Sequence, residues 1–246
     1  AEQNTQRILD YATRAYWRFL PQHERLGRAA ALEALLRDGL ATASTASRKA
    51  AWFAAFRDVV QTPEGLAWLE RVWRREETVP GLTFAETDEI NMALELAVRE
   101  VEGWNEILET QYRRTQNPDR KERFAFVRPA LSADPAVRDA SFERFKALEN
   151  RGREPWVLEA LQYLHHPLRE EHARRYIRPG LELLREIQQT GDIFFPTRWM
   201  NATLAGHRTR DAVAIVHDFL AEELQYPQRL RWTILTALDE PARAAR

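Results

Sequence analysis

Thr62-Pro63-Glu64 opens the stretch TPEGLAWLERVW (residues 62–73), which decides the fold class of this chain. Three start signals of an α-helix coincide there. Thr62 can cap backbone N–H groups, Pro63 fits the first helical position, and Glu64 places an acid in the first turn. Apolar side chains then recur on one helical face, at Leu66, Leu69 and Trp73. The stretch therefore predicts an amphipathic α-helix.

The same signals recur on both sides of this stretch. A capping side chain stands directly before proline at Asn117-Pro118 and Asp134-Pro135. Gly39 is expected to end the second helix of the chain. Further helices are expected at residues 156–164, 167–177, 179–189, 196–204, 210–224 and 228–239. Only Gly191–Pro196 indicates a short extended piece, and no alternation typical of a β-sheet is found.

These patterns predict an all-α fold. Many short helices joined by tight connections are typical of an α-α superhelix built from helix pairs. The spacing of the start signals is irregular, so the repeats are expected to be degenerate, as in HEAT and armadillo arrays. Residues 1–246 are expected to form a single helical-repeat domain.

The composition is that of a soluble globular protein, with 44% hydrophobic and 30% charged residues. The formal net charge of −1 supplies no overall field for nucleic acid or acidic lipid. Cysteine is absent, which excludes disulfides and thiolate-bound metals. Arginine greatly outnumbers lysine. A codon bias explains this excess, and so does a surface selected for carboxylate pairing, because arginine forms a bidentate fork that lysine cannot.

No catalytic motif is complete. A zinc peptidase of the gluzincin type needs H-E-x-x-H on a helix, and the sequence after His23-Glu24 lacks the second histidine. The segment His166–His172 has the wrong spacing for the inverted motif, and Pro167 interrupts it. His165 and His166 are instead expected to close the C-terminus of a helix as cations. The sequence assigns no catalytic residue, no metal ligand and no cofactor to this chain.

One basic segment and one tryptophan keep two interpretations each. The segment Asp119–Phe124 places cations in the first turns of a helix, where they oppose the helix dipole. Ion pairs with a neighbouring repeat would compensate them, and so would a bound anion or carboxylate. Trp199, close behind Phe194-Phe195, is interpreted as a core residue or as the wall of a groove.

Three stretches resemble the helical C-terminal domain of the M1 (gluzincin) aminopeptidases. They are Asn117–Leu131, which contains Val127-Arg128-Pro129; Glu154–Arg169, which contains Glu154-Pro155-Trp156 and His165-His166-Pro167; and Thr190–Pro196, with the sequence TGDIFFP. The likeness spans essentially the whole chain and is closest from about residue 117 onward. These motifs are not catalytic, so they identify a domain type.

The resemblance implies a function for the domain. In the family, zinc and the catalytic groups lie on an upstream thermolysin-like domain, and the helical domain packs on it and closes the substrate chamber. The chain is therefore expected to be the C-terminal part of a longer aminopeptidase. Its partners would be its own upstream catalytic domain and a peptide substrate. The zinc would lie in that catalytic domain, and this chain alone should be inactive.

The resemblance also implies a substrate-binding site. In the leukotriene A4 hydrolase branch, a basic pair before a Phe-x-Arg-Pro segment binds the C-terminal carboxylate of the peptide. Arg123 matches the first basic position, and Ala125 stands where the second would be. The expected site is Arg123 helped by Lys121 and Arg128. At about 100° per residue Lys121 and Arg128 share a helix face, whereas Arg123 lies about 160° from Lys121.

Two other functions are considered. A free-standing HEAT-like scaffold would bind a protein partner in its groove. A HEAT-like DNA-binding or glycosylase module would need a basic groove, which the balanced charge does not favour. We expect no nucleic-acid partner and no membrane partner. The sequence shows no signal peptide and no transmembrane segment, and it does not assign a compartment.

Overall fold

The computed structural model describes residues 2–245, and these residues confirm the all-α prediction. Helices account for 78% of the chain. The part of the chain that the structure describes contains no β-strand. The chain divides into two compact units, Ala1–Lys121 and Glu122–Arg246, with the division inside helix α7. The single domain expected over residues 1–246 stays a prediction.

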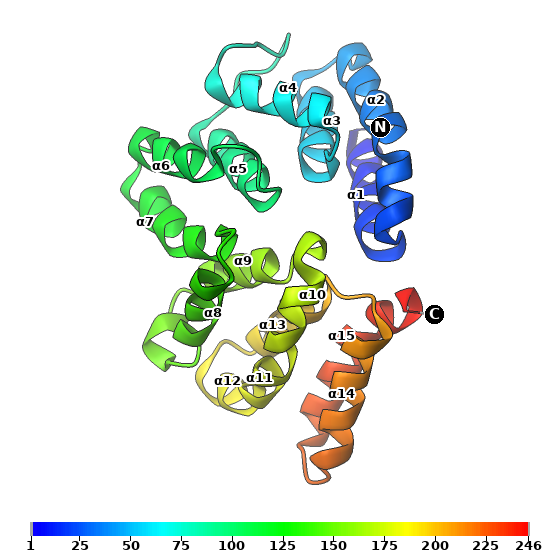
Figure 1. The fold of residues 1–246 in the computed structure, drawn as a ribbon, viewed down its shortest axis with the longest axis vertical. Helices are drawn as coiled ribbons and strands as arrows, with labels where there is room; N and C mark the ends of the chain where they lie inside the picture. The colour runs from blue at the N-terminus through cyan, green and yellow to red at the C-terminus, as the bar shows by residue number, and fades with distance from the viewer. Residues whose placement is uncertain (1, 246) are drawn as a thin grey trace. The chain divides into compact units, whose positions relative to one another are not determined.

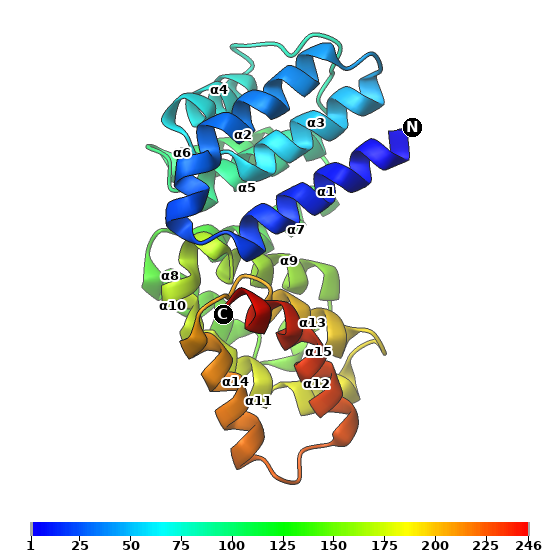
Figure 2. The same ribbon diagram turned by 90° about the vertical axis from the view of Figure 1, so that its right-hand side faces the viewer.

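The first unit is a stack of helices. Its members are α1 (Glu2–Phe19), α2 (Gln22–Thr42), α3 (Ala46–Val59), α4 (Pro63–Arg74), α5 (Glu86–Val98), α6 (Trp104–Arg114) and the start of α7 (Pro118–Val127). Helix α3 packs against both α1 and α2, and α5 packs against both α4 and α6 (Figures 1 and 2). Helices that are next but one in the chain also touch, as α1 and α3 do. This layered packing is the arrangement that helix-pair repeats predict.

The start of α4 follows the sequence prediction and adds a partner from another helix. The Thr62 hydroxyl accepts a hydrogen bond from Gly65 N at 3.0 Å. The buried Glu33 carboxylate of α2 accepts from the backbone N–H groups of Gln61 and Thr62 at 2.7 and 2.9 Å. A Cβ on Gly65 would lie 2.1 Å from Glu33 Oε2. The cap therefore depends on a glycine that lets the carboxylate approach.

The predicted end of the second helix at Gly39 is wrong. Helix α2 continues to Thr42, with Gly39 inside it. The reason lies in the packing of α3, because a Cβ on Gly39 would lie 2.5 Å from the ring of Trp52. Gly39 thus permits close contact between α2 and α3, and its conformational freedom at a helix end is not used.

The second unit continues α7 and adds short and long helices. They are η1 (Arg128–Leu131), α8 (Pro135–Arg144), η2 (Leu148–Arg151), α9 (Glu154–Leu164), η3 (Pro167–Arg169), α10 (Glu170–Ala173), η4 (Arg174–Tyr176), α11 (Ile177–Glu182), α12 (Leu184–Thr190), α13 (Phe195–Leu204), α14 (Arg210–Glu222) and α15 (Gln228–Ala244). Helix α13 packs between α9 and α15, and α14 contacts α11 and α15.

The core of the second unit settles the interpretation of Trp199. Its side chain is fully buried, and its indole N–H donates to the Gly180 carbonyl at 2.9 Å. Trp199 is therefore a core residue. Phe195 packs edge-on against it, with ring centroids 6.0 Å apart. The TGDIFFP stretch thus anchors the start of α13 in the core.

Two predicted elements of this unit differ from the structure. The helix expected over 167–177 is broken into η3, α10 and η4. The extended piece expected over 191–196 is a short turn that follows an extended Gly191, with φ −100° and ψ 177°, and leads into α13. Buried side chains hold both segments to other parts of the unit, and such contacts leave no periodic pattern in the sequence.

Membrane-spanning segments were also sought. Among residues 2–245, none of the helices combines the length and apolar character needed to cross a lipid bilayer.

Candidate functional site

The predicted carboxylate site lies on α7 and η1. Helix α7 begins at Pro118, so Lys121 and Arg123 both lie inside it and point to different faces. The Lys121 ammonium lies 4.7 Å from the centre of the Tyr112 ring, a cation–π contact. Arg128 is half-buried as the first residue of η1, and it has an interaction partner of its own. Lys121 and Arg123 therefore lie on different faces of α7.

Arg123 is held by a carboxylate of the same unit. Its Nε and one terminal nitrogen donate to the two oxygens of Glu159 on α9 at 2.6 and 2.5 Å. The hydrogen bonds that Arg123 donates to Glu159 raise the pKa of Arg123 above its usual value. This is the inter-helix ion pair that the sequence left as an alternative. Three of the five N–H donors of Arg123 remain for a ligand, and 26% of its side chain is exposed.

The three stretches that carry the resemblance meet in the second unit. Arg123 of the first stretch bonds Glu159 of the second. The buried Arg169 of the second stretch donates back to the carbonyls of Ala130 and Leu131, both at 2.7 Å. These bonds join α7 and η1 to α9 and η3.

The third stretch is tied to the second. The Glu154 carboxylate accepts from Asp192 N at 2.7 Å. A Cβ on Gly191 would lie 2.6 Å from the Phe195 ring and 3.1 Å from Glu154 Oε1. Gly191 is thus required by close packing. The residues of all three stretches therefore build one connected set of structural contacts.

A buried histidine pair was not predicted from the sequence. His165 Nδ1 lies 2.8 Å from His207 Nε2, so one imidazole donates to the other. The outer ring nitrogens, His165 Nε2 and His207 Nδ1, are buried without a hydrogen-bond partner. Burial lowers the pKa of His207 to about 4 and that of His165 well below its usual value. No short motif links positions so far apart, so only the fold could reveal the pair.

The predicted role of His165 and His166 as helix-closing cations is wrong. His165 does stand at the C-cap of α9, but it is buried and its lowered pKa makes it neutral. His166 instead precedes η3, where its Nδ1 accepts from Leu168 N at 3.2 Å. Over the described residues 2–245, groups of three or more His, Asp or Glu side chains that could hold a metal ion are absent.

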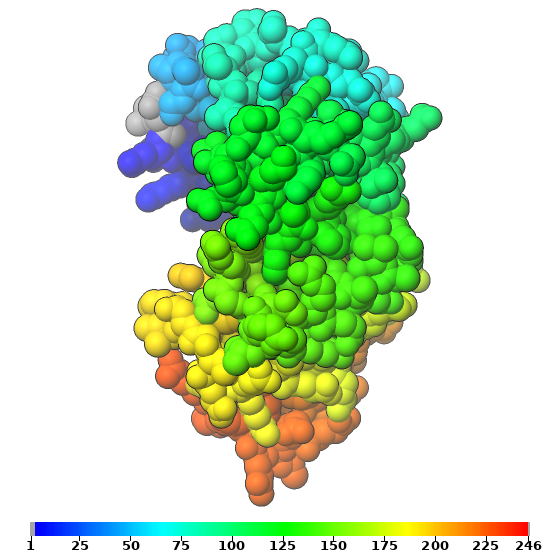
Figure 3. Space-filling view, turned by 90° about the vertical axis from the view of Figure 1, so that its left-hand side faces the viewer, coloured from blue at the N-terminus to red at the C-terminus, as the bar shows by residue number. Residues whose placement is uncertain are grey.

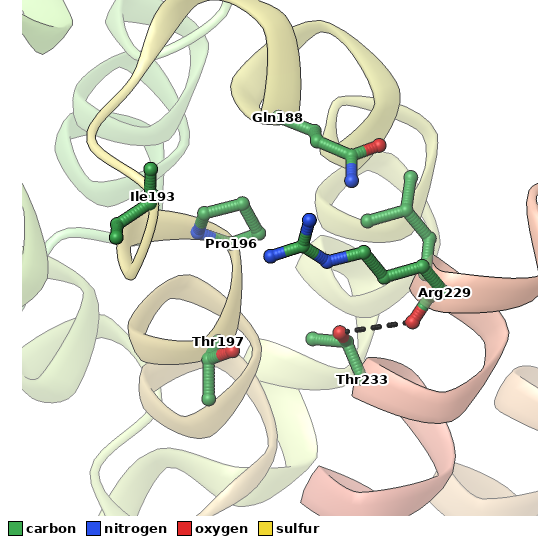
Figure 4. Close-up of a pocket in the computed structure, with 7 residues that line it drawn as sticks. Gln188, Ile193, Pro196, Thr197, Arg229 and Thr233 are labelled. Atoms are coloured by element: carbon green, nitrogen blue, oxygen red, sulfur yellow. Dashed lines mark hydrogen bonds between the residues drawn. The ribbon is translucent and has the colours of Figure 1, made fainter.

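A small pocket lies between the α12–α13 turn and the start of α15. Its volume is about 80 Å³. Its lining includes Gln188, Ile193, Pro196, Thr197, Arg229 and Thr233. Figure 4 shows the Arg229 guanidinium reaching from α15 toward Pro196, with Gln188 on one side and Thr197 on the other. Sequence analysis missed this pocket, because Arg229 lies in no motif.

Ile193, which lines the pocket, and the next residue, Phe194, are exposed apolar side chains. Ile193 is 72% and Phe194 57% exposed, and the Arg198 guanidinium lies 5.6 Å from the centre of the Phe194 ring. In the space-filling view, the yellow segment at the end of α12 stands out at the surface (Figure 3). An apolar rim beside a cation suits a ligand with both kinds of group.

Comparison with known proteins adds no relative. No family model matches the chain, and no curated protein matches it. The aminopeptidase resemblance therefore rests on the three stretches of sequence alone.

Proposed function

We propose that this chain is the helical domain that closes the substrate chamber of an M1-like zinc aminopeptidase. Peptide N-terminal hydrolysis would be carried by a catalytic domain upstream in the same chain. The observation that carries the proposal is the contact set formed by the three resembling stretches. Arg123–Glu159, Arg169–Ala130 and Glu154–Asp192 link them within one unit.

An apolar face of α1 offers a place for the upstream domain. Ile8, Tyr11 and Phe19 are 65%, 68% and 45% exposed. At about 100° per residue they share one side of α1, next to the side of the buried Leu9 and Tyr16. Exposed apolar stripes of this kind mark interaction surfaces in soluble domains. In the proposed enzyme this face packs against the catalytic domain.

The reading frame upstream of Ala1 provides the test. We expect an H-E-x-x-H motif there. The product of the whole frame should release the first residue of an aminoacyl anilide, and a chelator should abolish this activity. The chain of residues 1–246 alone should show no turnover and no stoichiometric zinc. A stop codon followed by a start codon directly before Ala1 would overturn the proposal.

A free-standing HEAT-like scaffold is the second candidate, and the α1 face is the observation that favours it. On that reading the apolar stripe binds a separate protein. Tyr11→Glu distinguishes the two. In the aminopeptidase it should uncouple the helical domain from the catalytic domain and lower peptidase activity. In the scaffold it should abolish capture of the partner, and no peptidase activity would exist at all.

A further inference from the structure

The buried histidine pair joins two segments of the second unit that are far apart in the chain. His165 caps the C-terminal end of α9, and His207 lies in the turn between α13 and α14, residues 205–209. Only 1% of His165 and 2% of His207 is exposed. The turn also rests on the backbone of α9, because a Cβ on Gly206 would lie 1.6 Å from the His165 carbonyl oxygen. Neither ring can therefore reach water unless the turn moves.

Protonation would change the hydrogen-bond balance of the pair. In the neutral pair each imidazole carries one N–H, and one of these N–H groups is donated to the other ring. The second N–H and one lone pair then lie on the outer nitrogens, His165 Nε2 and His207 Nδ1, which are buried without a hydrogen-bond partner. One added proton would turn that lone pair into another N–H donor and give the pair a full charge. A buried charge without a partner is far more costly than a buried neutral ring.

The groups packed around His165 do not supply a counter-charge. Tyr176 of η4 meets His165 edge-on, with ring centroids 5.9 Å apart. Its hydroxyl is donated to Asp139 of α8 at 2.6 Å. The same carboxylate also holds His172 and Arg175. Among the described residues, no carboxylate pairs with the His165 ring.

The groups around His207 oppose a positive charge. The Arg174 guanidinium of η4 repels a protonated His207, and it is itself paired with Asp211 of α14 at 2.5 Å. The Glu170 carboxylate of α10 accepts from Arg208 N at 2.6 Å and lies 3.4 Å from the Arg208 guanidinium. Both carboxylates are thus occupied. Water is the remaining partner for an imidazolium, and it is reached only when the turn opens.

The opening should stay local, because the turn has few apolar contacts. Between Ala205 and Thr209, the only buried residues are Gly206 and His207. Helix α9, in contrast, buries Leu161 and other apolar side chains completely. Segments with few buried apolar contacts open at a lower free energy than the core of the same unit.

We propose that the His165–His207 pair is an acid-sensitive switch for the turn between α13 and α14. Protonation of either ring releases residues 205–209 from the end of α9, and the imidazolium becomes hydrated. The start of α14 opens with the turn, because the Thr209 hydroxyl caps it by accepting from Ala212 N at 3.3 Å. The switch belongs to the second unit and does not depend on the aminopeptidase proposal.

Amide hydrogen exchange of the whole chain tests the switch, with rates corrected for the pH dependence of exchange itself. The amides of His207, Arg208 and Val213 report on the turn and the start of α14, where all three are hydrogen-bonded. From about pH 6.5 down to about pH 5 their protection should fall at least about tenfold per pH unit, since opening takes up one proton or more. At the acidic end they should exchange at least about tenfold faster than the amides of α9, and low urea should not accelerate them.

Two outcomes with the unaltered chain would overturn the proposal. One is protection of the turn that does not change with pH. The other is exchange of the turn and α9 at one rate with one urea dependence, which would mean that the unit opens only as a whole.

Variants assign the response to the pair. His207→Gln should reduce the pH dependence of turn protection, and His165→Gln combined with it should abolish that dependence. His172→Gln is the matched control, because His172 is a partly buried histidine of the same unit whose pKa is also lowered by burial; it should keep the full dependence. An unchanged pH dependence in the His207 variant, or its loss in the His172 variant, would overturn the proposal.

Discussion

At the scale of single residues, burial decides the chemistry of the histidines. His165 and His207 share one hydrogen bond in the core of the second unit, and their outer nitrogens find no partner. Protonation would place a charge there without a counter-ion. The pair therefore acts as a structural element that tolerates only the neutral form.

This predicts a loss of stability in mild acid. His207 has a pKa of about 4 in the folded state and the ordinary value of 6.5 when unfolded. As the pH falls, the unfolded state binds the proton first. The contribution of neutral His207 to the free energy of unfolding is therefore fully present above pH 6.5 and is lost as the pH drops toward about 4. The depressed pKa corresponds to about 3 kcal/mol across that window. His165 acts in the same direction.

Urea unfolding at several pH values from about 7.5 down to about 4.5 would measure this. His207→Asn should lower stability at neutral pH and flatten the acid-induced decline. Exposed His217 provides the control, because its imidazole meets water in both states; His217→Gln should keep the decline. An undiminished decline in the Asn variant would remove the pair as its cause.

Arg123 has a structural role and a proposed functional one. A double-mutant cycle of Arg123→Ala and Glu159→Ala should give a coupling free energy of about 1–2 kcal/mol, since the pair is bidentate and mostly buried. In the proposed full-length aminopeptidase, substrate binding at Arg123 predicts that Arg123→Ala raises KM for short free-acid peptides and leaves KM for an aminoacyl anilide unchanged. Equal changes for both substrates would leave the ion pair as its sole role.

At the scale of elements, two glycines of α2 separate packing from helix propensity. A Cβ on Gly39 would meet Trp52 at 2.5 Å, whereas a Cβ on Gly27 has open space around it. Gly39→Ala should therefore destabilise the chain by about 1–3 kcal/mol through overpacking. Gly27→Ala should stabilise it by about 0.5–1 kcal/mol, because alanine favours the helix. Thermal unfolding of both variants checks this, and a stabilised Gly39→Ala chain would contradict the packing argument.

At the scale of the whole molecule, helix dominates each unit. The chain should give a far-ultraviolet circular dichroism spectrum with a helical content near 78%. Capping side chains and short connections within layered helices support this content. A spectrum dominated by strand would refute the fold.

The amino-acid sequence by itself determined the helical fold class and most helix starts. Thr62, Asn117 and Asp134 cap the helices that the local pattern assigns to them. Capping and helical periodicity act within a few residues, so a single chain displays them directly. The resemblance of stretches within residues 117–196 to the M1 helical domain also came from the sequence alone. So did the choice of Arg123 as a candidate substrate-binding residue.

Only the tertiary structure decided which side chains meet. It paired Arg123 with Glu159 and packed Trp52 closely against Gly39. It also buried His165 against His207 and left Arg229 unpaired beside the α12–α13 turn. Each of these contacts joins residues that lie 13 to 42 positions apart in the chain, and their approach depends on how the helices pack. Local propensity carries no information on such contacts, because helix packing joins surfaces whose residues are remote in the chain.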